Sequence, residues 1–124
     1  MKILILVGLG GFLGSVLRLV ISDFFQTKHL TSFPYGTLAV NIIGCFVIGL
    51  VFGFVEKGQL SIEWRYFLAT GLIGGFTTFS AYSIETLNLF RDGNIRLAAV
   101  NILLNNVLGI LLALGGFAIA KLIR

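Results

Sequence analysis

The chain has 124 residues, of which 57% are hydrophobic and only 11% are charged. Soluble proteins contain about 25% charged residues, and a mean hydropathy of +1.03 is more apolar surface than a domain of this length can bury. The composition therefore excludes a soluble globular domain and predicts a membrane protein. The net charge of +4 sits at the ends of apolar stretches, which indicates contact with the membrane surface and not with nucleic acid.

Four stretches contain no Asp, Glu, Lys or Arg residue, namely residues 3–17, 29–55, 66–84 and 97–120. A helix needs about 20 residues to cross the hydrocarbon core, so each stretch predicts one transmembrane helix. We expect an all-α membrane protein, a single domain over residues 1–124, with helices at about 2–25, 34–55, 64–90 and 95–122. The first helix lacks the cleavage site of a signal peptide, and we expect it to be retained.

Gly10 and Gly14 in the first helix are four residues apart and predict a face on which another helix packs closely. Arg18 follows Gly14 by four residues and so lies on the same face. An arginine inside the lipid boundary is costly unless it faces protein or water. Alternatively, Arg18 extends its guanidinium group to the lipid headgroups, and both interpretations are open.

Asn41 is the one strongly polar residue inside the second helix, which Pro34 is expected to start. Its amide is either an interhelical hydrogen-bonding group, worth about 0.6 kcal/mol, or a donor that lines a pore. Cys45 lies in the same helix and predicts a small packing residue. His29, in the loop before it, is expected to be solvated, since nothing nearby completes a metal site.

The third helix is longer than one span requires, which leaves room for a break. Gly74-Gly75 and then Thr77-Thr78 form weak helical sequence, because glycine is flexible and threonine is β-branched. Broken helices in transporters bind cations through freed carbonyl groups, so a backbone cation site is possible here. The alternative is a continuous helix in which Gly71 and Gly75 form a packing face.

Polar and aromatic residues recur in the last two helices: Phe79, Ser80, Tyr82, Ser83, Asn101 and Asn105. Asn101 and Asn105 are four residues apart and share one helix face. These residues predict either a polar and aromatic track across the membrane or an ordinary core with interhelical hydrogen bonds.

The positive charges are shared almost evenly between the two ends of the predicted helices. With the termini lie Lys2, Lys57, Arg65, Lys121 and Arg124, and at the other end lie Lys28, Arg91, Arg96 and, if counted, Arg18. Such a weak bias permits insertion in either orientation. Four short helices enclose little space, so we expect a homo-oligomer, for which an antiparallel dimer is one arrangement.

Three motifs occur in order along the chain. The first helix reads Gly-Gly-Phe-Leu-Gly-Ser-Val-Leu-Arg over residues 10–18, and the second reads Gly-Thr-Leu-Ala-Val-Asn-Ile-Ile-Gly over residues 36–44. The third reads Gly-Gly-Phe-Thr-Thr-Phe-Ser-Ala-Tyr-Ser over residues 74–83. Together these motifs resemble those of the bacterial fluoride channels of the Fluc (CrcB) family, and the resemblance spans the whole chain.

The resemblance implies a multi-pass protein of the bacterial inner membrane that lets cytoplasmic fluoride leak out by a passive, voltage-driven route. It implies an antiparallel, dual-topology homodimer with two pores, a structural sodium ion at its centre, no organic cofactor and no nucleic-acid partner. By position, Phe79 would turn its ring edge to the ion and Asn41 would donate a hydrogen bond to it. The carbonyl groups of Gly74 and Thr77 would hold the sodium ion.

Further positions that the resemblance places near the pathway are Arg18, the signature arginine, and Ser80, Ser83, Glu85, Asn101 and Asn105. Three of the matched residues differ from those usual in the family. Tyr82 replaces the second pore phenylalanine, Asn101 stands where many members have tyrosine, and Asn105 stands at a usual serine.

Three other classes of protein fit the sequence less well than a channel. A proton-coupled drug exporter of this size needs a carboxylate in the substrate pocket, expected in the first helix, whereas Glu85 lies in the third. A membrane assembly subunit explains the glycine faces but not the polar residues. An enzyme is disfavoured because the chain shows no set of nucleophile, base and orienting group.

Overall fold

The computed structural model describes residues 1–28 and 31–123. The first two spans are single helices, α1 (Lys2–Lys28) and α2 (Tyr35–Glu56). The third span consists of α3 (Ile62–Arg65), the π-helical segment η1 (Tyr66–Ile73), α4 (Gly74–Phe76) and α5 (Phe79–Arg91). The fourth consists of α6 (Ile95–Leu103), the π-helical segment η2 (Leu104–Leu108) and α7 (Gly109–Leu122).

The prediction of an all-α chain with four helical spans is confirmed. Within residues 1–28 and 31–123, four spans are long and apolar enough to cross a membrane: Lys2–Lys28, Tyr35–Glu56, Ile62–Arg91 and Ile95–Leu122. The first continues through Lys28, beyond the end expected at about residue 25. Gln26 stays helical and links α1 to the start of α2: its Nε2 donates to the Phe33 carbonyl (3.3 Å), and its Oε1 accepts from the Gly36 N–H (3.3 Å). Pro34 occupies the N-cap of α2, and His29 lies outside the described residues.

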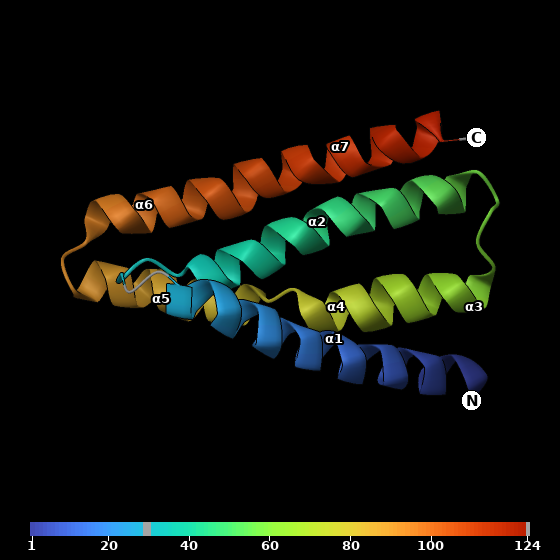
Figure 1. Cartoon of the computed structure of the whole chain (residues 1–124), viewed down its shortest axis with the longest axis horizontal. Helices are drawn as coiled ribbons and strands as arrows, with labels where there is room; N and C mark the ends of the chain where they lie inside the picture. The colour runs from blue at the N-terminus through green and yellow to red at the C-terminus, as the bar shows by residue number, and fades with distance from the viewer. Residues whose placement is uncertain (29–30, 124) are drawn as a thin grey trace.

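The four spans pack side by side (Figure 1). Helix α2 lies between α7 and the third span, and α1 packs along η1 and α4. Both termini lie at the same end of the molecule as the connection between α2 and α3. Gly10 and Gly14 are buried where α1 meets the third span, which confirms the predicted packing face. A Cβ atom on Gly10 would lie 2.6 Å from the Phe67 carbonyl oxygen, so the backbones touch.

Replacement of Gly14 by valine is expected to destabilise the fold. A Cβ atom on Gly14 would lie 2.8 Å from the Phe76 nitrogen and closer still to the Leu72 carbonyl oxygen. Overpacking of this kind costs about 1–3 kcal/mol, so Gly14→Val should lower the midpoint of thermal unfolding in detergent. Gly8→Val is the matched control, because a Cβ atom on Gly8 meets nothing within 4 Å. Equal midpoints for the two variants would contradict the packing described here.

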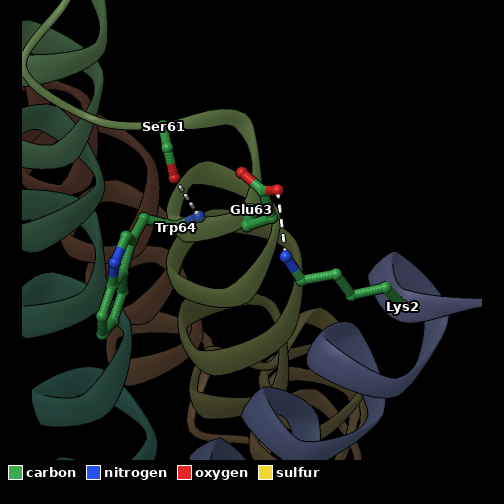
Figure 2. Close-up of polar contacts among 4 residues, drawn as sticks. All are labelled: Lys2, Ser61, Glu63 and Trp64. Carbon is green, nitrogen blue, oxygen red and sulfur yellow. Dashed lines mark hydrogen bonds and ion pairs between the residues drawn. The ribbon is translucent and has the colours of Figure 1, made fainter.

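Polar and charged side chains connect neighbouring helices on the side of the molecule where both termini lie. Lys2 Nζ lies 3.2 Å from Glu63 Oε1 beside Trp64, and the Ser61 hydroxyl accepts the Trp64 N–H (3.4 Å) at the N-cap of α3 (Figure 2). Lys57 donates to the Ala120 carbonyl (3.1 Å), which places a cation at the C-terminus of α7 where it complements the helix dipole. The contacts of Lys2 and Ser61 are exposed and contribute little to stability, whereas the Lys57 contact is partly buried.

The third span changes conformation near its middle, at Thr77 and Thr78. Thr77 has φ −77° and ψ 158°, and Thr78 has φ −148° and ψ 118°, so both are extended between α4 and α5 (Figure 1). Gly74 and Gly75, where the weak helical sequence was expected to open, are themselves helical, which corrects that expectation. A Cβ atom on Gly75 would lie 2.6 Å from the Gly11 carbonyl oxygen, so this glycine serves close packing against α1 and not chain flexibility.

Candidate functional site

The side chain of Asn41 in α2 makes hydrogen bonds with both backbone groups of the extended residue Thr78. Its Oδ1 accepts the Thr78 N–H (2.8 Å), and its Nδ2 donates to the Thr78 carbonyl (3.1 Å). The Thr78 hydroxyl accepts the Ala81 N–H (3.2 Å) and so caps α5. Buried backbone groups that leave a helix need such partners. The asparagine side chain therefore stabilises the interruption of the third span.

A ladder of hydrogen bonds continues from Asn41 across the bundle. Each step donates in the same direction: Asn41 Nδ2 to Asn105 Oδ1 (2.8 Å), Asn105 Nδ2 to Asn101 Oδ1 (2.9 Å), Asn101 Nδ2 to Thr86 Oγ1 (2.9 Å) and Thr86 Oγ1 to the Tyr82 carbonyl (2.7 Å). Asn101 is fully buried, with 0% of its surface exposed. The ladder joins α2, α5, α6 and η2 and leaves each buried amide with partners.

One end of this ladder opens into a pocket of about 380 Å³. The predicted site residues that line it are Asn41, Gly74, Thr77, Phe79, Tyr82 and Asn105, together with Thr78 and Asn106. The rings of Phe79 and Tyr82 are 5.3 Å apart at 59°, and the Phe79 side chain is 76% exposed while Tyr82 is buried. Amide groups and aromatic rings thus face a common space beside the interrupted helix. Asn101 lies behind this wall and does not line the pocket.

A second pocket, of about 650 Å³, also has Thr78 in its wall. The predicted site residues in its wall are Arg18, Ser80 and Glu85, with Thr37 and Thr78 beside them. Among the described residues that line the two pockets, Thr78 is the one they share, so the two spaces adjoin at this residue. Ser83 lines neither: it is exposed, and its hydroxyl donates to the Phe79 carbonyl (2.8 Å).

The second pocket contains one cation and one carboxyl group. Arg18 is half-buried and directs Nη1 toward the Thr77 carbonyl (3.5 Å), which favours the interpretation that it faces protein. Glu85 accepts the Thr37 hydroxyl at Oε1 (2.7 Å), and among the described residues its buried Oε2 has no hydrogen-bond partner. No ion pair joins Arg18 to Glu85 in residues 1–28 and 31–123. Arg18 therefore gives this pocket a positive charge that is not neutralised by direct contact.

Four residues of the two pockets and the ladder were missed as site residues from the sequence: Thr37, Thr78, Thr86 and Asn106. Thr37 precedes Asn41 by four residues, so the shared helix face was a usable signal. Thr78 was noticed only as weak helical sequence. Thr86 had no distinguishing pattern, since a single threonine in an apolar helix commonly bonds its own backbone.

The fold and the two pockets define a multi-pass membrane protein with polar groups near the middle of its spans. The family model described as "CrcB-like protein, Camphor Resistance (CrcB)" matches residues 5–117, and the chain belongs to this family. The resemblance noted from the three motifs is thus confirmed.

Relatives of nearly the same length are similar throughout. A protein of Parabacteroides distasonis is 42% identical over 120 residues, which cover 97% of this chain and 93% of the relative. One of Flavobacterium psychrophilum is 45% identical over 126 residues, with 98% of both chains covered. One of Methylobacillus flagellatus is 45% identical over 119 residues, with 94% and 93% covered. Each relative is named "Fluoride-specific ion channel FluC".

Proposed function

We propose that this protein is a fluoride-selective channel that lowers cytoplasmic fluoride by passive, voltage-driven efflux, and that it has no enzymatic activity. The observation that carries the proposal is the pocket in which the amides of Asn41 and Asn105 meet the rings of Phe79 and Tyr82. The relatives described above, each named as a fluoride-specific ion channel, support the same conclusion.

The chemistry of this pocket suits a small anion. Fluoride is strongly hydrated, so a selective pore must replace its water with hydrogen-bond donors. Amide N–H groups supply such donors, and the edge of an aromatic ring is positive and complements an anion. A membrane that is negative inside drives an anion outward by about 2.3 kcal/mol per 100 mV, so efflux needs no coupled energy source.

We place the pathway along the two pockets on either side of Thr78. Arg18 attracts the anion in the larger pocket, which is the vestibule, and Ser80 offers a hydroxyl donor there. The anion then passes Thr78 to reach Asn41 and Phe79. Asn41 Nδ2 donates to Asn105 Oδ1, so this hydrogen bond must break before Nδ2 can donate to an anion.

The proposed assembly is an antiparallel, dual-topology homodimer with two pores in the bacterial inner membrane. Phe79 is 76% exposed beside the helix interruption, and a second copy of the chain would cover it. The even distribution of positive charge between the two ends permits both orientations.

A structural sodium ion at the centre of the dimer remains part of the proposal, held by the Gly74 and Thr77 carbonyl groups. In a continuous helix, the Thr78 N–H would donate to the Gly74 carbonyl and the Ala81 N–H to the Thr77 carbonyl. These donors instead bind Asn41 Oδ1 and Thr78 Oγ1, so both carbonyl groups lose their helical donor, as a backbone cation site requires. Arg18 Nη1 lies 3.5 Å from the Thr77 carbonyl oxygen, and this long contact would have to give way to the ion. The bound ion would add positive potential where burial of an anion is costly.

Fluoride flux from liposomes tests the proposed activity. Purified protein should release fluoride when a negative internal potential is imposed, with little release of chloride under the same potential. Equal flux of the two anions would contradict the proposal. Strict dependence on a proton gradient would instead support a proton-coupled exporter. The observation that favours this alternative is the half-buried carboxyl group of Glu85 in the second pocket.

Removal of sodium tests the proposed cation site. Exchange of sodium for a large organic cation during purification should weaken the dimer, because the Gly74 and Thr77 carbonyl groups of two copies would then face each other without a cation between them. The measurement is the dimer fraction on dilution in detergent, with potassium as a second replacement ion. An unchanged dimer fraction in all three salts would remove sodium from the proposal and leave the anion pathway unaffected.

A further inference from the structure

Asn106 lines the same pocket as Phe79 and Tyr82 but takes no part in the asparagine ladder. Its Nδ2 donates to the Ile102 carbonyl (2.8 Å) and to the Tyr82 hydroxyl oxygen (3.1 Å). The carbonyl contact fixes the orientation of the amide, because a flipped amide would set Oδ1 against the Ile102 oxygen. The two hydrogens of the Asn106 amide are therefore donated to the Ile102 carbonyl and to the Tyr82 hydroxyl oxygen, and the Tyr82 oxygen is an acceptor.

This assignment leaves the hydrogen of the Tyr82 hydroxyl free to donate elsewhere. A phenol oxygen can accept one hydrogen bond and donate another, and within residues 1–28 and 31–123 no bond donated by this hydroxyl is formed. The Tyr82 side chain is 9% exposed, so its ring is held by its neighbours. Tyr82 and Asn106 both line the pocket, and a hydroxyl hydrogen directed into that space can serve an occupant of it.

We propose that Asn106 is a positioning residue that turns the Tyr82 hydroxyl into a donor for an anion in this pocket. The inference rests on the proposed channel function and names a determinant of its selectivity. Phenylalanine at residue 82 would offer only a ring edge, whereas the tyrosine and asparagine pair adds an O–H donor. A small anion with concentrated charge accepts a stronger hydrogen bond than a large one, so the added donor favours fluoride over chloride.

A double-mutant cycle tests this pairing. Four proteins are compared in liposomes: the unchanged chain, Asn106→Leu, Tyr82→Phe, and the double variant. Asn106→Leu should lower fluoride flux about fivefold in the unchanged background, the size expected when one hydrogen bond is lost. The same substitution should change flux less than about twofold in the Tyr82→Phe background, because no hydroxyl remains to be oriented. The ratio of fluoride to chloride permeability should fall in parallel.

Two controls separate positioning from damage to the fold. Asn88→Leu removes an exposed asparagine of α5 that lies in neither pocket and should leave flux and selectivity unchanged. Size-exclusion chromatography verifies that each variant keeps the assembly of the unchanged protein. An equal loss from Asn106→Leu in both backgrounds would overturn the pairing, since the asparagine would then act without Tyr82.

Vibrational spectroscopy tests the hydrogen-bond direction independently of flux. The difference between the Raman spectra of the unchanged chain and Tyr82→Phe isolates the ring doublet of this tyrosine, which reports whether its oxygen accepts or donates. We expect an accepting oxygen that loses this character in Asn106→Leu. A purely donating hydroxyl would overturn the inference. If the unchanged protein carries no fluoride but the spectrum shows an accepting oxygen, the channel proposal fails while the assigned hydrogen-bond geometry stands.

Discussion

Phe79→Ile is expected to reduce fluoride flux by about a hundredfold or more, which corresponds to a barrier higher by about 2.7 kcal/mol. The Phe79 ring is 76% exposed at the start of α5, borders the pocket and lies 5.3 Å from the Tyr82 ring. Isoleucine keeps an apolar side chain but has no positive ring edge with which to face an anion. The measurement is fluoride efflux from liposomes under an imposed potential.

Phe90→Ile is the matched control for this variant. Phe90 is also an exposed phenylalanine of α5, and it lines neither the first pocket, which Phe79 borders, nor the second pocket, which contains Arg18. Its replacement should leave flux within about twofold of the unchanged protein, as surface substitutions usually do. The Phe79 variant should elute from size-exclusion chromatography at the volume of the unchanged protein, because only the aromatic character of the side chain is lost. Normal flux through the Phe79→Ile protein would reject the role assigned to the ring.

Asn41→Asp is expected to lower flux by a similar factor, about a hundredfold, and to destabilise the third span. The amide of Asn41 uses its two hydrogens on the Thr78 carbonyl and on Asn105 Oδ1. A carboxylate has no hydrogen and a neutral acid has one, so at least one acceptor loses its donor in either state. An unsatisfied buried group costs about 1–3 kcal/mol. Ionisation would also set a negative charge against the anion.

Two measurements distinguish the effects of Asn41→Asp. Thermal unfolding in detergent reports the loss of stability, and efflux from liposomes reports conduction. Asn88→Asp adds the same group at an exposed position of α5 outside both pockets and should change neither quantity appreciably. Retained flux in Asn41→Asp, together with a lower unfolding midpoint, would leave Asn41 as a structural residue that holds Thr78 and takes no direct part in conduction.

Local sequence patterns predicted those features of the fold and the site that are set within a single helix. The fourth span was predicted at residues 95–122, as observed, because apolar composition and flanking charges are properties of a single segment. The shared face of Asn101 and Asn105 follows from helical spacing, and the Asn105 amide does reach Asn101. The packing role of Gly10 and Gly14 followed for the same reason.

Contacts between helices were not predictable in this way. Asn41 and Thr78 are 37 residues apart, and Asn41 and Asn105 are 64 apart, so their meeting depends on how α2 packs against its neighbours. The position of the extended residues also followed from packing, since Gly75 is held helical against α1 while Asn41 satisfies the backbone of Thr78. No spacing rule indicated that Asn106 donates to Tyr82.

The amino-acid sequence by itself determined that this is a four-span membrane protein and, through its three motifs, to which family it belongs. Hydropathy and motif identity are written along the chain and need no knowledge of helix packing. Only the tertiary structure decided that Thr78 lines two pockets, that Arg18 lines one and Phe79 the other, and which way each amide donates. The physical reason is that buried polar groups take the partners that helix packing brings within hydrogen-bond distance.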